Sequence, residues 1–267
     1  MSPVLQTTKL SVRFGGVHAV NEVDLTVEEG QLVGLIGPNG AGKTTFIDAI
    51  TGFVRSTGGV TLDGEDITRL SPHQRARRGL GRTWQASELF DDLTVRENLL
   101  VAARRPSLWG VAKELFGAPI TKTEETERAL ELVDLTWAGD MRPTDLSQGQ
   151  RKLVGVARAI AMQPRLLCLD EPAAGLDTHE SEDLGRRLRS LVDGGQSMLL
   201  IDHDMGLVMS ICDQIFVLEF GKLIASGPPD VVRRDPEVIK AYLGSAAAEL
   251  ADEVDGEPAR AADGGER

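Results

Sequence analysis

The stretch Gly37-Pro38-Asn39-Gly40-Ala41-Gly42-Lys43-Thr44, here called the glycine loop, decides the fold. It fits the pattern G-x-x-x-x-G-K-[S/T] in full. The apolar run Gln31–Ile36 precedes it, and a helix is predicted to begin near Gly42. Glycines in such a loop let backbone N–H groups surround phosphate oxygens, and the start of the helix adds a positive dipole. The stretch therefore predicts a phosphate-binding loop between a buried strand and a helix.

Three side chains at the end of the glycine loop are suited to binding a nucleotide and its metal. Lys43 is expected to reach the β- and γ-phosphates, and the Thr44 hydroxyl is expected to bind Mg²⁺. Thr45 is expected to add a contact to the α-phosphate. A chance glycine turn is the alternative, and the flanking strand, the helix and the Lys-Thr pair argue against it.

A second segment, Leu166-Leu167-Cys168-Leu169-Asp170-Glu171, places two carboxylates after four apolar residues. Ligands of open α/β sheets bind at the carboxyl ends of such buried strands. Asp170 is expected to hold Mg²⁺ through water, and Glu171 to polarise an attacking water as general base. A strand that ends in Asp-Glu is usually just solvated, but together with the glycine loop it predicts hydrolysis.

Hydrophobic patterning indicates an α/β fold. Residues 1–30 alternate between polar and apolar positions, which predicts half-buried antiparallel strands. The apolar runs at 166–169, 198–201 and 215–218, with helices between them, predict parallel strands that are buried on both faces. We therefore expect a mostly parallel sheet, an antiparallel β subdomain near the N-terminus, and a helical subdomain inserted at about residues 88–163.

Composition excludes several classes of protein. The net charge of −12 argues against a general nucleic-acid binder. No apolar run approaches the length of about 20 residues that spans a membrane, and the N-terminus does not resemble a signal peptide. Cys168 and Cys212 are expected to be buried hydrophobes rather than zinc ligands. We expect one domain over residues 1–244 and a disordered acidic tail over 245–267, which holds seven acidic and two basic residues.

With these motifs in place, the chain from Leu5 to Gly244 resembles the nucleotide-binding subunits of ABC transporters. Its most diagnostic part, Leu146-Ser147-Gln148-Gly149-Gln150, is similar to the signature motif of the family. Ser147 can cap the following helix, and Gly149 allows a close backbone approach. The sequence departs from many members at Gln148, where they have glycine. The resemblance implies a P-loop NTPase core that uses ATP and Mg²⁺, with each nucleotide clamped across a head-to-tail dimer.

The same resemblance implies roles for further residues. Gln85 matches a glutamine that senses Mg²⁺ and the attacking water, and Asp177 lies in a loop through which two subunits touch. His203 resembles a histidine that contacts the γ-phosphate. Phe14 lies where the family stacks an aromatic ring on adenine, although a core phenylalanine is an alternative. Taken together, the implied roles are catalysis by Lys43, Glu171 and His203, metal contacts from Thr44, Gln85 and Asp170, and ATP contacts from Phe14, residues 37–45, Gln85, Ser147, Gly149, Gln150 and Asp177.

Several segments resemble the ATPases of branched-chain amino-acid importers, and the stretch from Ala103 to Glu125 favours the larger of their two ATPase types. These segments are Arg13–Gly16, Arg82–Gln85, Leu89–Leu100, Pro172–Leu176 and Ala241–Gly244. Urea and amide importers and lipopolysaccharide exporters carry related ATPases, so the cargo stays open. The resemblance implies separate permease subunits that dock near residues 86–99, an indirect link to a solute-binding protein, and a position on the cytoplasmic face of the membrane.

Two non-transport functions are alternatives. Translation and DNA-repair factors of the same superfamily usually carry two ATPase units or long coiled-coil insertions, and this chain shows one glycine loop and one signature. A nucleotide-binding regulator without turnover is disfavoured by Glu171 and His203. A cluster of arginines is expected either to face lipid headgroups or the permease, or to form a solvated helix face. Its members are Arg75, Arg77, Arg78 and Arg82.

Overall fold

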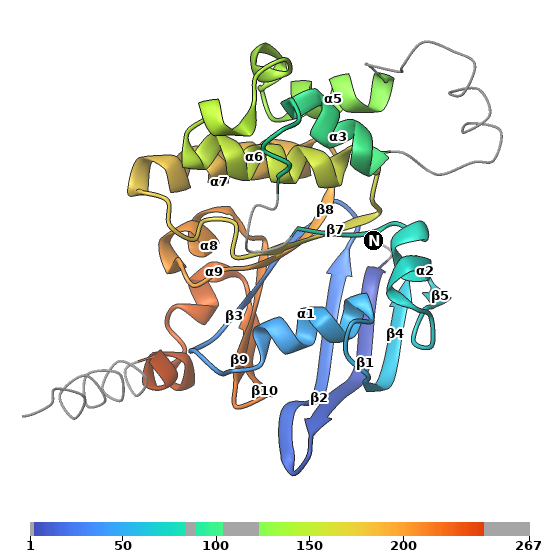
Figure 1. Ribbon diagram of the computed structural model, residues 1–267. Coiled ribbons are helices and arrows are strands. Elements are labelled where there is room, and N and C mark those ends of the chain that lie inside the picture. The colour runs from blue at the N-terminus through green and yellow to red at the C-terminus, as the bar shows by residue number, and fades with distance from the viewer. Residues whose placement is uncertain (1–2, 84–88, 104–122, 243–267) are drawn as a thin grey trace, which may run out of the picture.

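The structure is a computed structural model that describes residues 3–83, 89–103 and 123–242. Within these residues the chain forms two sheets with helices packed around them (Figure 1). Gln85, most of the 103–125 stretch and the tail 245–267 lie outside the described residues, as does the start of the predicted docking segment. In the described part of the chain, no helix has both the length and the apolar character that crossing a membrane requires.

The larger sheet is mostly parallel, as predicted. Its six strands in the described residues run in the order β10-β9-β3-β8-β7-β6, and only the edge strand β10 is antiparallel to its neighbour. Every residue of β3, β7 and β8 is buried, which explains why these strands read as continuous apolar runs rather than alternating ones. The bounds are β3 Leu32–Ile36, β6 Leu80–Arg82, β7 Leu166–Asp170, β8 Ser197–Ile201, β9 Gln214–Glu219 and β10 Lys222–Gly227.

The parallel register brings three loops to one edge of this sheet. Ile201 at the end of β8 pairs with Leu35 of β3 on one side and with Asp170 of β7 on the other. The residues that follow these three strands are therefore neighbours. They are the glycine loop after β3, Glu171 after β7 and Asp202 after β8.

The second sheet is antiparallel and has the strand order β2-β1-β4-β5 in the described residues. Its strands are β1 Pro3–Phe14, β2 Val17–Glu28, β4 Thr57–Leu62 and β5 Glu65–Asp66. Asp63 and Gly64, a dipeptide typical of hairpin turns, form one here with φ values of +48° and +75°, as a two-residue type I′ turn requires. Helix α1, Lys43–Thr51, buries Phe46 and Ile50 in a core that contains residues of both sheets.

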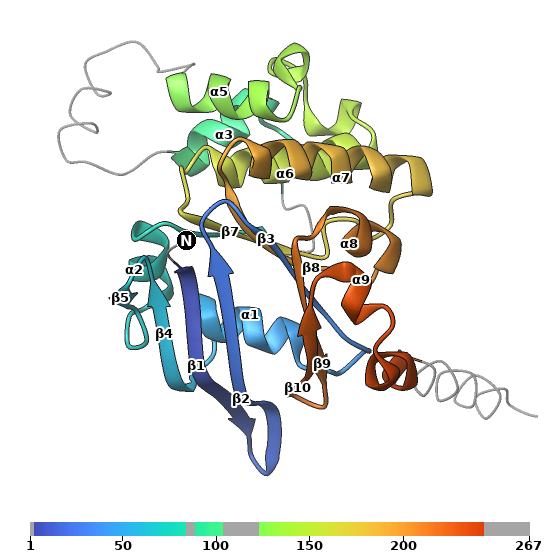
Figure 2. The same cartoon turned by 180° about the vertical axis from the view of Figure 1, so that it is seen from behind.

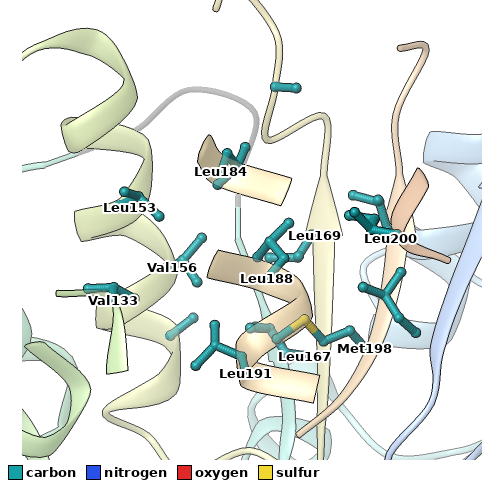
Figure 3. Packing of buried hydrophobic residues seen from close by; sticks show 14 of the residues in the cluster. Val133, Leu153, Val156, Leu167, Leu169, Leu184, Leu188, Leu191, Met198 and Leu200 are labelled. Atoms are coloured by element: carbon teal, nitrogen blue, oxygen red, sulfur yellow. The ribbon is translucent and has the colours of Figure 1, made fainter. Parts of the chain in front are cut away.

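Helices cover the other face of the parallel sheet. Helices α3 (Val95–Ala103), α5 (Glu124–Leu132) and α6 (Gln148–Ile160) pack against one another. Figure 3 shows the apolar face of α7 (Thr178–Asp193), with Leu184, Leu188 and Leu191, packed among the side chains of α6 and of strands β7 and β8. Short helices in the described residues include α2 Pro72–Arg77, α8 Met205–Ile211, α9 Pro229–Val232 and the 3₁₀ turns Thr136–Ala138 and Pro143–Asp145, and residues 236–242 are also helical.

Two helices begin at capping residues that are readable in the sequence. Thr94 and Glu97 form a reciprocal capping box, in which the backbone N–H of Thr94 donates to Glu97 Oε2 at 2.7 Å. Ser71 caps α2, as its Ser-Pro signal predicts.

The two cysteines are buried, and burial raises the pKa of the Cys168 thiol to about 12. That shift suits an unreactive core residue.

The interpretation of the arginine cluster as one exposed surface is wrong. Arg75 is 3% exposed, and its guanidinium donates to the carbonyl oxygens of Ala49 at 2.8 Å and Ile50 at 2.6 Å. It also donates to Thr68 O at 2.6 Å. The planar fork of five donors thus satisfies carbonyl oxygens in the last turn of α1, where Ala49 O also accepts from the Gly52 N–H at 3.2 Å. Arg82 is likewise turned inward, as described below.

Replacing Arg75 by methionine is expected to lower the free energy of unfolding by about 3 kcal/mol, because buried carbonyl groups lose their charged donor. Arg77→Met on the same helix is the matched control, since Arg77 is exposed, and its expected change is within about 0.5 kcal/mol. Urea unfolding followed by circular dichroism measures both. Equal stabilities of the two variants would contradict the capping role of Arg75.

Candidate functional site

The glycine loop is shaped by backbone that lies immediately behind it. A Cβ atom on Gly37 would lie 2.1 Å from the carbonyl oxygen of Leu218 in β9, and one on Gly42 would lie 2.2 Å from that of Ala19 in β2. Both glycines also have left-handed φ values, +151° and +105°. Gly42 is the N-cap of α1 and has no side chain to cover the free N–H groups of the helix. The loop therefore leaves its backbone donors available for an anion.

Lys43 folds back over this loop. Its Nζ atom donates to Gly37 O at 2.7 Å and to Pro38 O at 3.1 Å. Burial lowers the pKa of Lys43, and the carboxylates of Glu171, Asp170 and Asp202 partly oppose that shift. The ammonium group is thus a buried cation near three acids. Next to it, Thr44 is exposed and Thr45 half-buried, while Asn39 and Gly40 lie on the exposed rim of the loop.

Asp170 is oriented by an arginine rather than left in solvent. Arg82, on β6, places Nη2 at 2.8 Å from Asp170 Oδ2 and Nη1 at 2.6 Å from Asp48 Oδ1 on α1. Both partners in the Arg82–Asp170 pair are nearly buried. One guanidinium therefore ties the end of β7 to the helix that follows the glycine loop. This positioning role was missed from the sequence, where Arg82 was grouped with the surface arginines.

Glu171 has an unusual backbone and a histidine neighbour. Its φ of +47° is left-handed, a conformation that is rare for a residue other than glycine and that concentrates at functional sites. Its backbone N–H donates to Ile201 O at 2.7 Å, which holds the residue against β8. His203 Nδ1 lies 4.0 Å from Glu171 Oε2, and the histidine side chain is 61% exposed. The carboxylate and the imidazole therefore border the same open space.

Asp202 is a second residue that sequence reasoning missed. It is fully buried, and its carboxylate accepts from the backbone N–H groups of Ala173 at 3.0 Å, His203 at 2.8 Å and Asp204 at 3.0 Å. These bonds join the loop after β7 to the loop after β8, and so position Glu171 relative to His203. Its signal was a charged residue directly after a buried strand, the same signal that pointed to Asp170.

The signature segment lies apart from the glycine loop. Ser147 caps α6 by accepting from the Gln150 N–H at 3.3 Å, and the Gln150 side chain accepts from the Ser147 N–H at 2.9 Å. The Gly149 N–H donates to Glu180 of α7 at 3.3 Å, and Asp177 is the N-cap of that helix. Figures 1 and 2 show the start of α7 in the helical layer, on the opposite side of the parallel sheet from α1.

Two aromatic residues lie on segments that contact the glycine loop. Phe14, at the end of β1, is 55% exposed, so the alternative of a core phenylalanine is wrong. Tyr242, the only tyrosine of the chain, packs against the core, and its hydroxyl lies close to the backbone of Gly37. Burial raises the pKa of Tyr242 to about 12, while the nearby Gly37 backbone acts in the opposite direction. The C-terminal part of the chain thus contacts the start of the loop.

The donor set fits Mg²⁺ better than a metal held by protein alone. The hydroxyl of Thr44 and the carboxylate of Asp170 are oxygen donors, which Mg²⁺ prefers. Among the described residues, no cluster of three or more His, Cys, Asp or Glu side chains forms a closed metal cage. A site with one or two protein oxygens is what Mg²⁺ uses when phosphate and water supply its other ligands.

Comparison with known families shows the family of this chain. The family model described as ABC transporter matches residues 20–174. The chain belongs to the ABC transporter family. ATP hydrolysis is the general activity of this family, so the predicted ABC ATPase fold and ATP-hydrolase activity are confirmed. A second family model, described as Branched-chain amino acid ATP-binding cassette transporter, matches residues 222–248 of this ABC ATPase.

Individual ABC proteins match along almost their full length. The high-affinity branched-chain amino acid transport ATP-binding protein BraF of Pseudomonas aeruginosa is 45% identical, and the match covers 91% of this chain and 99% of BraF. LivG of Escherichia coli, described in the same words, is 40% identical with the same coverage. The crystal structure of the ADP conformation of MJ1267, an ATP-binding cassette of an ABC transporter, superposes with a TM-score of 0.81 at 31% identity, covering 91% of this chain and 100% of MJ1267.

Proposed function

We propose that this ABC ATPase powers the import of branched-chain amino acids as the ATP-hydrolysing subunit of a multi-component transporter. The main support for this cargo is the match of residues 222–248 to the branched-chain amino acid family model. This segment lies outside the general ABC match, so it adds information about the type of transporter. The printed functions of BraF and LivG support the same cargo. The chain would act on the cytoplasmic face of the membrane, bound to separate permease subunits.

The residues at the edge of the parallel sheet account for hydrolysis. ATP phosphates enter the glycine loop, where the Lys43 ammonium exchanges its two carbonyl partners for β- and γ-phosphate oxygens. Thr44 and Asp170 would hold Mg²⁺, and the ion would supply positive charge to the phosphate oxygens. Glu171 takes a proton from the attacking water, and His203, beside it, donates to the γ-phosphate. The hydrogen bonds of Asp202 hold the loops that carry Glu171 and His203 in fixed positions relative to each other.

The separation of the signature segment from the glycine loop supports a head-to-tail dimer. The N-terminus of α6 offers backbone N–H groups and a positive dipole, which suit a phosphate. In one chain, Ser147 and Gly149 begin a helix that packs among other helices, away from α1. A second ATPase subunit would bring its own Ser147, Gly149 and Gln150 to the γ-phosphate, with Asp177 at the contact between subunits. The site of one chain is then half of a working site.

Purification of the tagged chain from its own membranes tests the transport function. We expect a pair of permease subunits and an amino-acid-binding protein in the same preparation, and loss of labelled leucine uptake when the gene is deleted. Uptake of labelled urea should be unchanged. Loss of urea uptake with normal leucine uptake would reassign the cargo, and recovery of lipid-export components would indicate an exporter. Strong stimulation of the ATPase rate by nucleic acid would contradict transport altogether.

A further inference from the structure

The turn between β9 and β10 contains an aromatic residue where turn chemistry does not favour one. Glu219 pairs with Lys222, so Phe220 and Gly221 form a two-residue hairpin turn. Their φ values are +46° and +78°, the signature of a type I′ turn, which prefers Asn-Gly or Asp-Gly. The other such turn described above, Asp63-Gly64, follows that preference. A bulky side chain at a left-handed position carries a conformational cost.

Phe220 is not compensated by packing. It is 82% exposed, more than any other large apolar side chain in the described residues. Neither the turn nor the core therefore explains why phenylalanine occupies this position. Residues that break a local rule without a structural gain are expected at functional sites.

The turn borders the glycine loop. The N–H of Gly221 donates to Ala41 O in that loop at 2.9 Å, and Gly221 O accepts from the Asn21 N–H of β2 at 2.8 Å. A Cβ on Gly221 would lie within 3.0 Å of the backbone oxygens of His18 and Ala19, so the turn is in close contact with β2. Both views show the end of the β9–β10 hairpin beside the β1–β2 hairpin (Figures 1 and 2).

Two more exposed apolar side chains adjoin this contact. Phe14 pairs with Val17 across the β1–β2 ladder, and both are exposed. Val17 immediately precedes His18, which lies against Gly221. The glycine loop is thus flanked by the turn that carries Phe220 and by the β1–β2 hairpin that carries Phe14 and Val17. A nucleotide could bind here with its flat base against the aromatic rings and its phosphates in the glycine loop.

We propose that Phe220 contacts the purine base of the bound nucleotide and, together with Phe14, determines the affinity of the site for the base. This inference rests on the proposed nucleotide site in the glycine loop. Stacking of a base on an aromatic ring uses the ring face and needs no hydrogen bond to the base. The exposed ring is then retained at a strained position because it serves the ligand.

Replacement of Phe220 by asparagine separates function from structure. Asparagine suits a type I′ turn, so the thermal unfolding temperature is expected to stay equal or rise. ATP affinity, measured by calorimetry, is expected to fall about tenfold, because one base–aromatic contact is lost. Affinity for inorganic tripolyphosphate should not change, since it has no base. Phe220→Trp should bind ATP like the unmodified protein, and Trp137→Asn, which removes an exposed aromatic elsewhere, should have no effect.

A parallel Lys43→Ala measurement distinguishes a failure of the proposed phosphate site from a failure of the proposed Phe220 contact. If that variant binds both ATP and tripolyphosphate normally, the proposed phosphate site itself is wrong. If Lys43→Ala loses both ligands while Phe220→Asn binds ATP normally, only the role of Phe220 is wrong. Equal losses of ATP and tripolyphosphate in Phe220→Asn would mean that the turn acts on the loop rather than on the base. Normal ATP affinity with loss of a co-purifying subunit would assign the ring to a protein partner and overturn the proposal.

Discussion

Replacement of Glu171 by glutamine is expected to lower the rate constant of ATP hydrolysis by about 10² to 10⁴, because a positioned general base is lost. Glutamine keeps the length of the side chain and both hydrogen-bonding atoms but cannot accept the proton of water. The backbone of residue 171 is held by its bond to Ile201 O, so the loop should keep its shape. ATP should therefore still bind, and the variant should accumulate as an ATP-bound dimer. Single-turnover hydrolysis and size-exclusion chromatography with ATP measure the two effects.

Glu182→Gln is the matched control for this substitution, because Glu182 is an exposed glutamate on α7. It makes the same chemical change without touching the edge of the sheet where Glu171 lies. Its hydrolysis rate should equal that of the unmodified protein. Near-normal turnover in Glu171→Gln would remove Glu171 from the role of general base.

Replacement of Lys43 by alanine is expected to weaken ATP binding by about 10² to 10³, since charge-assisted hydrogen bonds to phosphate are lost. In the free protein, burial lowers the pKa of Lys43, which means that the folded chain disfavours the charged ammonium there. Phosphate oxygens would relieve that cost on binding. The substitution therefore removes a group that is poorly stabilised until the ligand arrives.

Lys222→Ala controls for loss of positive charge near the loop, because Lys222 is exposed at the start of β10. Its ATP affinity should stay within about twofold of the unmodified protein, as expected for a screened surface charge. Equilibrium binding of a fluorescent ATP analogue compares the two variants. Equal affinities would contradict the phosphate-binding role of Lys43.

Many elements of the fold can be predicted from short stretches of the sequence. Continuous apolar runs predicted β7, β8 and β9, because strands covered on both faces have no polar side to alternate with. The turn Asp63-Gly64 and the capping box of Thr94 and Glu97 were also predictable, since their partners are two or three residues away. The parallel register then makes the strand-end rule valid, which is why Asp170 and Glu171 lie at the same edge as the glycine loop.

The positions of Arg75 and Arg82 could not be predicted from the residues next to them in the sequence. Arg82 and Asp170 are 88 positions apart, and no local pattern indicates that they pair. Arg75 contacts carbonyl oxygens 25 and 26 positions away, although its sequence neighbourhood reads as a basic surface helix. A charged side chain can satisfy the same local pattern in solvent or in the interior. Only the positions of its distant partners decide between them.

The sequence by itself determined the chemistry of this protein, because a phosphate-binding loop needs particular residue types at particular spacing along one strand–loop–helix unit. It also determined the family to which the chain belongs. Tertiary structure alone decided which groups support that chemistry. The Arg82–Asp170 ion pair, the Asp202 hydrogen bonds between the loops after β7 and β8, and the contact of the Phe220–Gly221 turn with the glycine loop all join segments that are distant along the chain. Hydrogen bonds and ion pairs act over a few ångströms, so their partners are selected by packing and not by order in the sequence.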